Sequence, residues 1–231
     1  MKHFPSAPPV TNESGPRSSG NTVKLHFEIE RIFEGKAFAR PLFYSCPGGL
    51  RFQLSESGAV LEQFLTAFLK AKEICSDIFL NDTTLVACLR VHSGSNKFAH
   101  RPRIQALRSA GINIPSECSV WSEKIDPQQW FSEGEPEFWI NVAFEAPATL
   151  LQTFLWCALT KDFAEIQPNP KCAVYLFNLN KQIMVFPYDD RGMDVVGPNK
   201  DLLAELYRQH HEYLLGYDRQ TMEATFERAI R

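Results

Sequence analysis

The chain has 231 residues, of which 44% are hydrophobic and 22% are charged. This length and composition allow one ordinary-to-large domain with a sizeable core and exclude a chain that is disordered throughout. The formal net charge of -3 excludes a basic surface that covers the whole molecule. Any site for nucleic acid would therefore have to be local, and we expect none.

No stretch reaches the roughly 18 consecutive apolar residues of a membrane span, and the N-terminal residues lack the apolar segment of a secretory signal. Four of the six cysteines, Cys75, Cys88, Cys157 and Cys172, lie in apolar runs, where a free cysteine behaves as a small buried hydrophobe. No cysteine spacing predicts a metal site. We therefore expect a cytoplasmic protein with reduced thiols, no membrane contact, no metal and no cofactor.

The first part of the chain predicts a leader, a helix, a loop and a strand. Residues 1–22 are rich in Pro, Ser, Gly and Asn and predict a flexible leader. Residues 23–33 carry apolar side chains at helical spacing and predict a short amphipathic helix, which Gly35 ends. Residues 40–49 predict a loop that prolines and glycines constrain, and residues 50–54 alternate as a half-buried strand does.

A long helix with Ser57 as its N-cap is expected next, with one broad inward face. Residues 83–92 are apolar on both faces and predict a covered interior strand. Residues 102–110 predict a short helix that Gly111 ends. The expected inward residues of the long helix are Leu61, Phe64, Leu65, Phe68, Lys72, Cys75, Ile78 and Phe79.

The second half of the chain supplies the remaining elements. They are a strand over 137–145, a helix over 148–163, strands over 172–179, 182–188 and 193–197, and helices over 200–215 and 218–230. Asp218 is the expected N-cap of the last helix. Together the elements predict an α+β fold, with helices packed on a mixed or antiparallel sheet of five to seven strands and two helices at the C-terminus. The expected domain spans 23–231 and holds an acidic, aromatic-rich insertion at about 93–135.

Three passages carry a family resemblance. They are Pro41-Leu42-Phe43-Tyr44 followed by Leu50-Arg51-Phe52-Gln53-Leu54, then Asp82-Thr83-Thr84-Leu85-Val86, and finally Tyr188-Asp189-Asp190-Arg191-Gly192-Met193-Asp194 with Tyr217-Asp218-Arg219. Together they resemble the bacterial domain-of-unknown-function family 3885 over most of residues 38–226. The resemblance implies similar fold boundaries and a bacterial origin, and it implies no activity and no catalytic residue.

The first candidate site is the turn passage formed by Tyr188, Asp189, Asp190, Arg191, Gly192 and Asp194. The neighbouring carboxylates of Asp189 and Asp190 can bind a metal or share a proton, and Arg191 can hold a phosphate or a carboxylate. In the alternative, structural interpretation, one aspartate caps the turn, Gly192 takes a positive φ and Arg191 pairs with a carboxylate of a packed helix. We favour the structural interpretation, because each residue has a use in a hairpin turn.

The second candidate site is a set of aromatic rings interleaved with carboxylates. Residues 117–137 hold six carboxylates against Lys124 alone. Aromatic anchors surrounded by charge are typical of specific protein–protein contacts. The alternative is a solvated loop whose tryptophans cover the sheet. The expected partner-binding residues are Trp121, Asp126, Trp130, Phe131, Glu133 and Glu135.

These two sites support two hypotheses of function. The first is a non-enzymatic, cytosolic protein-binding module, and its most concrete form is an immunity protein that neutralises a bacterial toxin by occluding it. The second is a metal- or phosphate-dependent enzyme centred on Asp189, Asp190 and Arg191. We favour the first, because no nucleophile–base arrangement, phosphate loop or zinc spacing is present in the sequence. The oligomeric state stays open.

Overall fold

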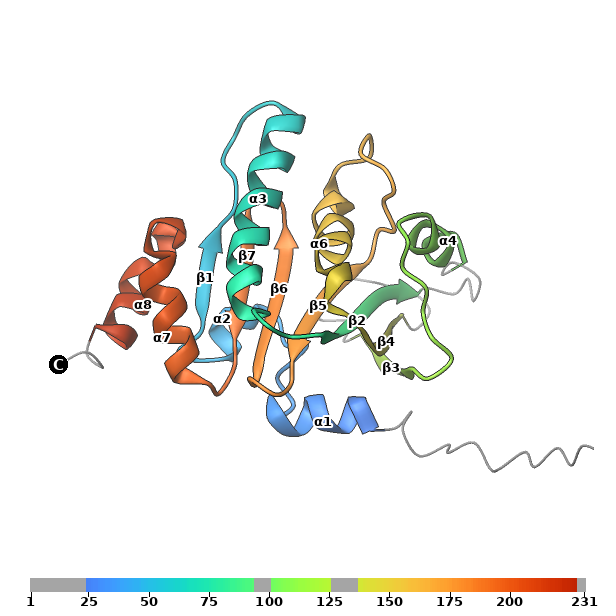
Figure 1. Ribbon diagram of the computed structural model, residues 1–231, viewed down its shortest axis with the longest axis horizontal. Coiled ribbons are helices and arrows are strands. Elements are labelled where there is room, and N and C mark those ends of the chain that lie inside the picture. The colour runs from blue at the N-terminus through green and yellow to red at the C-terminus, as the bar shows by residue number, and fades with distance from the viewer. Residues whose placement is uncertain (1–23, 94–100, 126–136, 228–231) are drawn as a thin grey trace, which may run out of the picture.

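The computed structural model describes residues 24–93, 101–125 and 137–227 (Figure 1). Its helices are α1 (Lys24–Ile32), α2 (Leu42–Ser45), α3 (Val60–Ile78), α4 (Arg101–Ser109), α6 (Leu151–Leu159), α7 (Lys200–Gln209) and α8 (Arg219–Phe226). Its strands are β1 (Leu50–Gln53), β2 (Thr84–Ser93), β3 (Ser119–Lys124), β4 (Phe138–Pro147), β5 (Ala173–Asn178), β6 (Ile183–Asp189) and β7 (Gly192–Val196). Short 3-10 turns occupy Ala148–Leu150, Thr160–Asp162, His211–Tyr213 and Gly216–Asp218. The predicted leader over 1–22 lies outside the described residues.

The strands form one antiparallel sheet of seven, in the order β1-β7-β6-β5-β2-β4-β3. This confirms the α+β class and the two C-terminal helices, α7 and α8. β2 lies between β5 and β4, as its apolar composition on both faces predicted. No helix in the described ranges combines the length and the apolar character that crossing a membrane requires.

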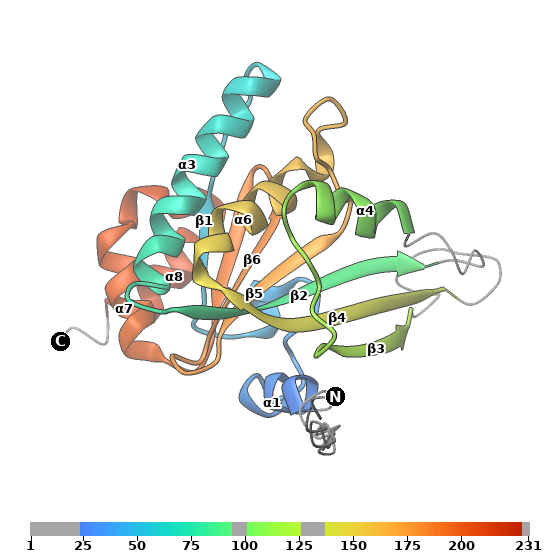
Figure 2. The ribbon, with the colours of Figure 1, turned by 45° about the vertical axis from the view of Figure 1, so that its right-hand side comes forward.

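Successive side chains of each strand enter two separate hydrophobic cores, because a strand directs them alternately to opposite faces. In β5, Val174 and Leu176 join the core under α3, α6 and α7, whereas Tyr175 and Phe177 join a smaller core under α1. Figure 2 shows α1 on the side of the sheet opposite α3 and α6. Both cores are therefore needed to cover the sheet.

The start and the inward face of α3 differ from the prediction. The helix begins at Val60, and Ala59 rather than Ser57 occupies the N-cap position without a side-chain cap. Phe64 is buried, but Leu61 is 63% exposed and Leu65 is 46% exposed. The reason is that the buried face of α3 is a different stripe of the helix. Leu61 and Leu65 lie on an outer stripe with Leu69, which is 61% exposed, whereas the buried residues are Phe64, Ala67, Ala71, Ile74, Cys75 and Ile78.

Within the insertion predicted at about 93–135, the structure describes one helix and one strand. α4 is present and ends near Gly111, which has a positive φ of 88°. Residues 119–124, however, form the edge strand β3, which pairs with β4 from Ser119↔Ala143 to Lys124↔Phe138. Its mixture of serine, tryptophan and charged residues suits an edge strand with a half-exposed face, and for that reason it carried no clear strand signal.

The two edges of the sheet are finished differently. At β1, the chain after α7 returns to the edge, because Leu215 N donates to Arg51 O at 2.9 Å and Leu214 bridges to Phe52. At the opposite edge, β4 is the one strand of the described ranges that pairs with β3.

The prediction of one helix over 200–215 was wrong, since α7 ends at Gln209 and a 3-10 turn follows.

Candidate functional site

The turn between β6 and β7 is held by its own side chains. The Asp189 carboxylate accepts hydrogen bonds from Arg191 N at 2.9 Å and from Gly192 N at 3.1 Å. It also pairs with the Arg191 guanidinium, at 2.7 Å from Oδ2, while the Arg191 side chain is 76% exposed. Arg191 therefore pairs inside the turn, and the expected pairing with a packed helix was wrong.

Gly192 is required for a different reason from the one predicted. It is not among the described glycines with a positive φ. A Cβ built on Gly192 would instead overlap the hydroxyl oxygen of Tyr188. The ring of Tyr188 lies across the glycine, so any larger residue must displace that ring.

Asp190 is half-buried. Its carboxylate accepts a hydrogen bond from Ser55 Oγ at 3.2 Å, and burial raises the pKa of Asp190.

The other motif residues meet around Arg51 of β1. Arg51 Nε donates to Asp194 Oδ1 at 2.7 Å, and a second guanidinium nitrogen donates to Asp194 Oδ2 at 3.0 Å. A third bond, of 3.2 Å, reaches Asp218 Oδ2. Asp218 also accepts from the Tyr44 hydroxyl at 2.7 Å, and the guanidinium lies over the rings of Tyr44 and Tyr188. We call these five residues the Arg51 cluster.

The charged side chains of the Arg51 cluster are buried and paired, whereas Tyr44 is 54% exposed. The side chains of Arg51, Asp194 and Asp218 are 11%, 2% and 4% exposed. Asp218 was expected to cap α8, but it makes no capping hydrogen bond and serves Arg51 instead. Burial raises the pKa of Asp194, and the bonds from Arg51 oppose that rise. Asp194 thus stabilises the fold and is not placed to join Asp189 and Asp190 as a third ligand.

A cleft of about 620 Å³ opens between α1 and the β2-β4-β3 end of the sheet. Its walls come from α1, the loop after α1, and strands β2, β3 and β4. We call it the α1–β3 cleft. The lining side chains that matter most here are His26, Glu30, Arg40, Arg90, Trp121 and Trp139. Its volume lies within the range of about 300–1,000 Å³ that is typical of ligand pockets.

Glu123 of β3 fixes the floor of this cleft. Its Oε1 accepts from Trp121 Nε1 at 3.0 Å and from Asn141 Nδ2 at 2.9 Å. Its Oε2 accepts from the Arg90 guanidinium at 2.8 Å. Three donors therefore saturate this carboxylate and hold the Trp121 ring in place. The ring stacks on His26 of α1, with centroids 4.0 Å apart.

Two arginines share one tryptophan in the same cleft. The guanidinium carbons of Arg40 and Arg90 each lie 5.1 Å from the centre of the Trp139 ring. Arg40 is exposed and contacts the Tyr175 hydroxyl at 3.5 Å, and it forms no ion pair with a described carboxylate. Arg90 is buried, and its Nε has no hydrogen-bond partner within the described ranges. The positive charge at this end of the cleft is thus only partly compensated.

Glu30 gives the α1 side of the cleft the opposite sign. Its carboxylate lines the cleft and makes no ion pair or side-chain hydrogen bond within the residues described. Burial raises the pKa of Glu30, while nearby His26 lowers it and Glu123 raises it further. The cleft therefore carries a carboxylate on its α1 wall and guanidinium groups on its β2 wall and on the loop after α1.

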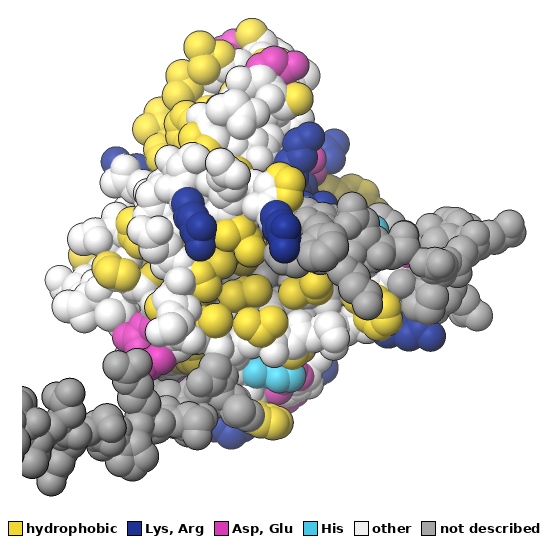
Figure 3. Space-filling model, turned by 90° about the vertical axis from the view of Figure 1, so that its right-hand side faces the viewer, with side chains coloured by type: hydrophobic (Ala, Val, Ile, Leu, Met, Phe, Trp, Pro, Cys, Tyr) yellow, Lys and Arg dark blue, Asp and Glu magenta, His cyan; other side chains and the backbone are white. Residues whose placement is uncertain are grey.

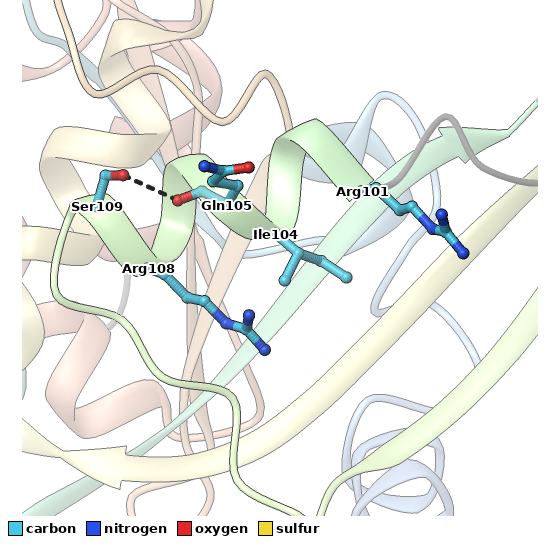
Figure 4. A pocket seen from close by; sticks show the side chains of 5 residues that line it. All are labelled: Arg101, Ile104, Gln105, Arg108 and Ser109. Atoms are coloured by element: carbon cyan, nitrogen blue, oxygen red, sulfur yellow. Dashed lines mark hydrogen bonds between the residues drawn. The ribbon is translucent and has the colours of Figure 1, made fainter.

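A second hollow, of about 630 Å³, lies along α4. Figure 4 shows Arg101, Ile104 and Arg108 projecting from one side of that helix, with Gln105 and Ser109 beside them. All five lining residues belong to α4, so no other element closes the hollow. Figure 3, which views this end of the molecule, shows hydrophobic, acidic and basic side chains and a histidine on one face. We therefore prefer the α1–β3 cleft, which several elements build.

The structure describes only one of the predicted partner-binding residues, Trp121, and places it in the α1–β3 cleft. The others, Asp126, Trp130, Phe131, Glu133 and Glu135, lie outside the described residues. Sequence reasoning missed Glu30, Arg40 and Arg90. Of these, Arg90 had a usable signal, because an arginine in an interior strand with apolar neighbours needs a buried partner.

No group of three or more His, Cys, Asp or Glu side chains in the described ranges is arranged to hold a metal ion. In comparisons with known proteins, a family model described as "Domain of unknown function (DUF3885)" matches residues 25–218. No curated protein and no solved structure matches the chain.

Proposed function

The chain belongs to the DUF3885 family, and we propose that it is a non-enzymatic, cytoplasmic binding module that holds a partner protein in the α1–β3 cleft. The observation that carries the proposal is the lining of the cleft. Trp121 is held in position by Glu123 and His26, and Arg40 and Glu30 bring to the same surface charge that no described residue pairs. Fixed aromatic rings beside charged groups suit specific recognition of another protein.

Several features support binding over catalysis. The carboxylate of Glu123 is occupied by three donors, so it is poorly placed to act as a base. The carboxylate of Asp189 is similarly occupied by its own turn. Burial raises the pKa of Cys157 and that of Cys172 to about 12, so neither supplies a thiolate nucleophile at neutral pH.

The outer edge of β3, which pairs with no other described strand, adds a second recognition element. Ile125 N donates to Glu137 O, so the alternation of an antiparallel pair directs the backbone groups of Val120, Ser122 and Lys124 away from β4. Unpaired strand edges accept extended segments of other proteins. A partner segment along β3 would thus place its side chains in the adjoining cleft.

The experiment is affinity capture with the full chain from an extract of the source organism, with two matched serine variants. Ser122→Arg adds a long charged side chain to the edge strand that borders the cleft, whereas Ser109→Arg adds the same side chain to exposed α4. We expect one stoichiometric protein with the wild type and with Ser109→Arg, and its loss with Ser122→Arg. For the purified partner, the affinity for Ser122→Arg should fall by about tenfold or more, which corresponds to about 1.4 kcal/mol.

Equal capture by all three proteins would exclude the cleft as the binding surface, and the absence of any stoichiometric partner would count against a binding module. A fourth protein, Trp130→Ala with Glu133→Lys and Glu135→Lys, tests the partner-binding residues predicted from the sequence. The narrower proposal, an immunity protein that covers a bacterial toxin, is tested by the identity of the captured protein.

A further inference from the structure

We propose that the α1–β3 cleft binds an oxyanion, a carboxylate or a phosphate, between Arg40 and Arg90 above the Trp139 ring. The inference deepens the proposed function, on which it rests, because it names the chemical group by which the partner is anchored. It assigns the basic end of the cleft to recognition of the anion and the aromatic rings to recognition of the group that carries it.

Charge is the first argument. Arg40 and Arg90 bring two positive charges to one tryptophan, and Glu123 is the carboxylate that pairs with Arg90. Arg40 is left without a carboxylate partner among the described residues. Glu123 also accepts from Trp121 and Asn141, so its negative charge is shared among three donors. An entering anion would balance the remaining charge in a partly buried site, where electrostatic attraction is stronger than in water.

Hydrogen-bonding capacity is the second argument. A guanidinium has five N–H donors. Arg90 uses one in a 2.8 Å bond to Glu123, another makes a 3.5 Å contact with Phe38 O, and its Nε has no partner among the residues described. Among the described residues, the one hydrogen bond of the Arg40 side chain is the 3.5 Å contact with the Tyr175 hydroxyl. Both arginines therefore retain donors that an oxyanion can fill.

Orientation is the third argument. A guanidinium that lies over an aromatic ring is held by cation–π attraction, while its N–H groups stay free to bind in its own plane. Trp139 holds both guanidinium groups in this way. Such a preset group binds carboxylate and phosphate with short, paired hydrogen bonds. The preset geometry lowers the entropy cost of binding.

The other residues of the cleft restrict which ligands can present the oxyanion. The stacked pair of Trp121 and His26 offers a flat apolar surface. Glu30 repels a second negative charge at the α1 side of the cleft. The preferred ligand therefore has its oxyanion at one end and a flat or apolar body next to it. A glutamate or aspartate side chain of a partner and a small aromatic carboxylate share this chemistry.

The test titrates the full chain with benzoate, inorganic phosphate and benzylamine and follows the indole N–H signals of all four tryptophans by NMR. We expect saturable shifts of the Trp121 and Trp139 signals with benzoate, weaker shifts with phosphate, and none with benzylamine, which has the opposite charge. Trp156, which lies on α6 away from the cleft, is the internal reference. Higher ionic strength should weaken binding.

Arg40→Gln should weaken benzoate binding by about tenfold or more, because it removes one charged donor. Arg40→Lys keeps the charge but loses the planar pair of donors. Its affinity for benzoate should therefore lie between those of the wild type and Arg40→Gln. Arg108→Gln, on exposed α4, is the matched control and should bind as the wild type does. Shifts that do not saturate, or that survive in Arg40→Gln, overturn the proposal.

A blocked peptide, acetyl-Ala-Glu-Ala-amide, separates the two sources of the anion. Binding tighter than that of acetate identifies an acidic side chain of a partner, whereas preference for benzoate identifies a small aromatic ligand. If Ser122→Arg abolishes partner capture but Arg40→Gln does not, and benzoate fails to bind, the anion site is wrong and the binding module stands. If benzoate binds through Arg40 while no variant changes capture, the anion site stands and the protein-binding module is wrong.

Discussion

The guanidinium of Arg51 and the carboxylate of Asp194 form a two-bonded ion pair, with distances of 2.7 and 3.0 Å, between directly paired positions of β1 and β7. Tyr44 and Asp218 join the same cluster through Asp218. Two of the three passages that carry the family resemblance, the first and the last, therefore meet at one point. Their shared role is to fix the edge strand, the turn and the C-terminal segment to one another.

Loss of Arg51 should destabilise the protein strongly. Arg51→Met leaves the buried carboxylates of Asp194 and Asp218 without a cation, and removal of one partner from a buried ion pair costs about 3–5 kcal/mol. Urea unfolding measures the loss. Arg191→Met is the control, because Arg191 is exposed, and it should cost less than about 1 kcal/mol. Equal losses would show that the Arg51 cluster is not a structural centre.

Gly192→Ala should cost about 1–3 kcal/mol, as is typical when an added group overfills a packed site. The added Cβ must displace the ring of Tyr188. The effects of substitutions at Gly192 and Tyr188 on stability should be coupled. Removal of that ring with Tyr188→Ala should make the double variant less destabilised than the sum of the two single variants. Additive losses in thermal or urea unfolding would contradict the steric explanation.

Neighbouring residues of α3 should respond very differently to substitution. Phe64 is buried against Trp156 and Phe163, so Phe64→Ala should cost about 3–5 kcal/mol. Leu65 is 46% exposed, and Leu65→Gln should cost less than about 1 kcal/mol. The unfolding free energies of the two variants are to be compared directly. A large loss at Leu65 would mean that this part of α3 is covered.

Glu30 should make stability depend on pH. Burial raises its pKa above the ordinary value of 4.5, with His26 opposing and Glu123 adding to the rise. The folded protein therefore binds this proton more tightly than the unfolded chain, and this contribution to stability is lost as the pH rises through the raised pKa. Glutamine does not ionise.

Glu30→Gln should therefore gain stability relative to the wild type as the pH rises from below 4.5 to neutral. The gain should stay within about 0.5 kcal/mol, as for most surface changes. Unfolding free energies of both proteins across this range measure it. A difference that does not vary with pH would mean that Glu30 is fully solvated.

Asp189→Ala distinguishes a structural turn from a functional one. Without the carboxylate, the backbone N–H groups of Arg191 and Gly192 lose their acceptor, at a cost of about 1–2 kcal/mol. Capture of the partner should not change. If capture falls while the unfolding free energy stays the same, the turn itself is the functional site, and the hypothesis centred on Asp189, Asp190 and Arg191 regains support.

The sequence was informative where one local pattern decides the structure. The alternation in 50–54 and 137–145, the helical spacing in 23–33 and the hairpin signals after 172 all correspond to elements of the fold. The turn at Asp189 was correctly expected to cap its own backbone, because Asp in that position has few other uses. β3 escaped detection, since an edge strand needs no strong apolar alternation.

The cleft was not predictable, because its residues come from separate elements that only the sheet order brings together. β2 lies beside β4, and β4 beside β3, so Arg90, Asn141 and Glu123 become neighbours. The exposure of Leu65 was not predictable either: periodicity shows which residues share a face, but tertiary packing decides how wide the buried part of that face is.

The most direct test of the central claim is site-specific photo-crosslinking of the full chain to its captured partner. A photoreactive residue replaces Ser122 at the rim of the α1–β3 cleft in one protein and exposed Arg191 in the turn in another. The account predicts a crosslinked adduct from position 122 and none from position 191. An adduct from position 191 alone would contradict it.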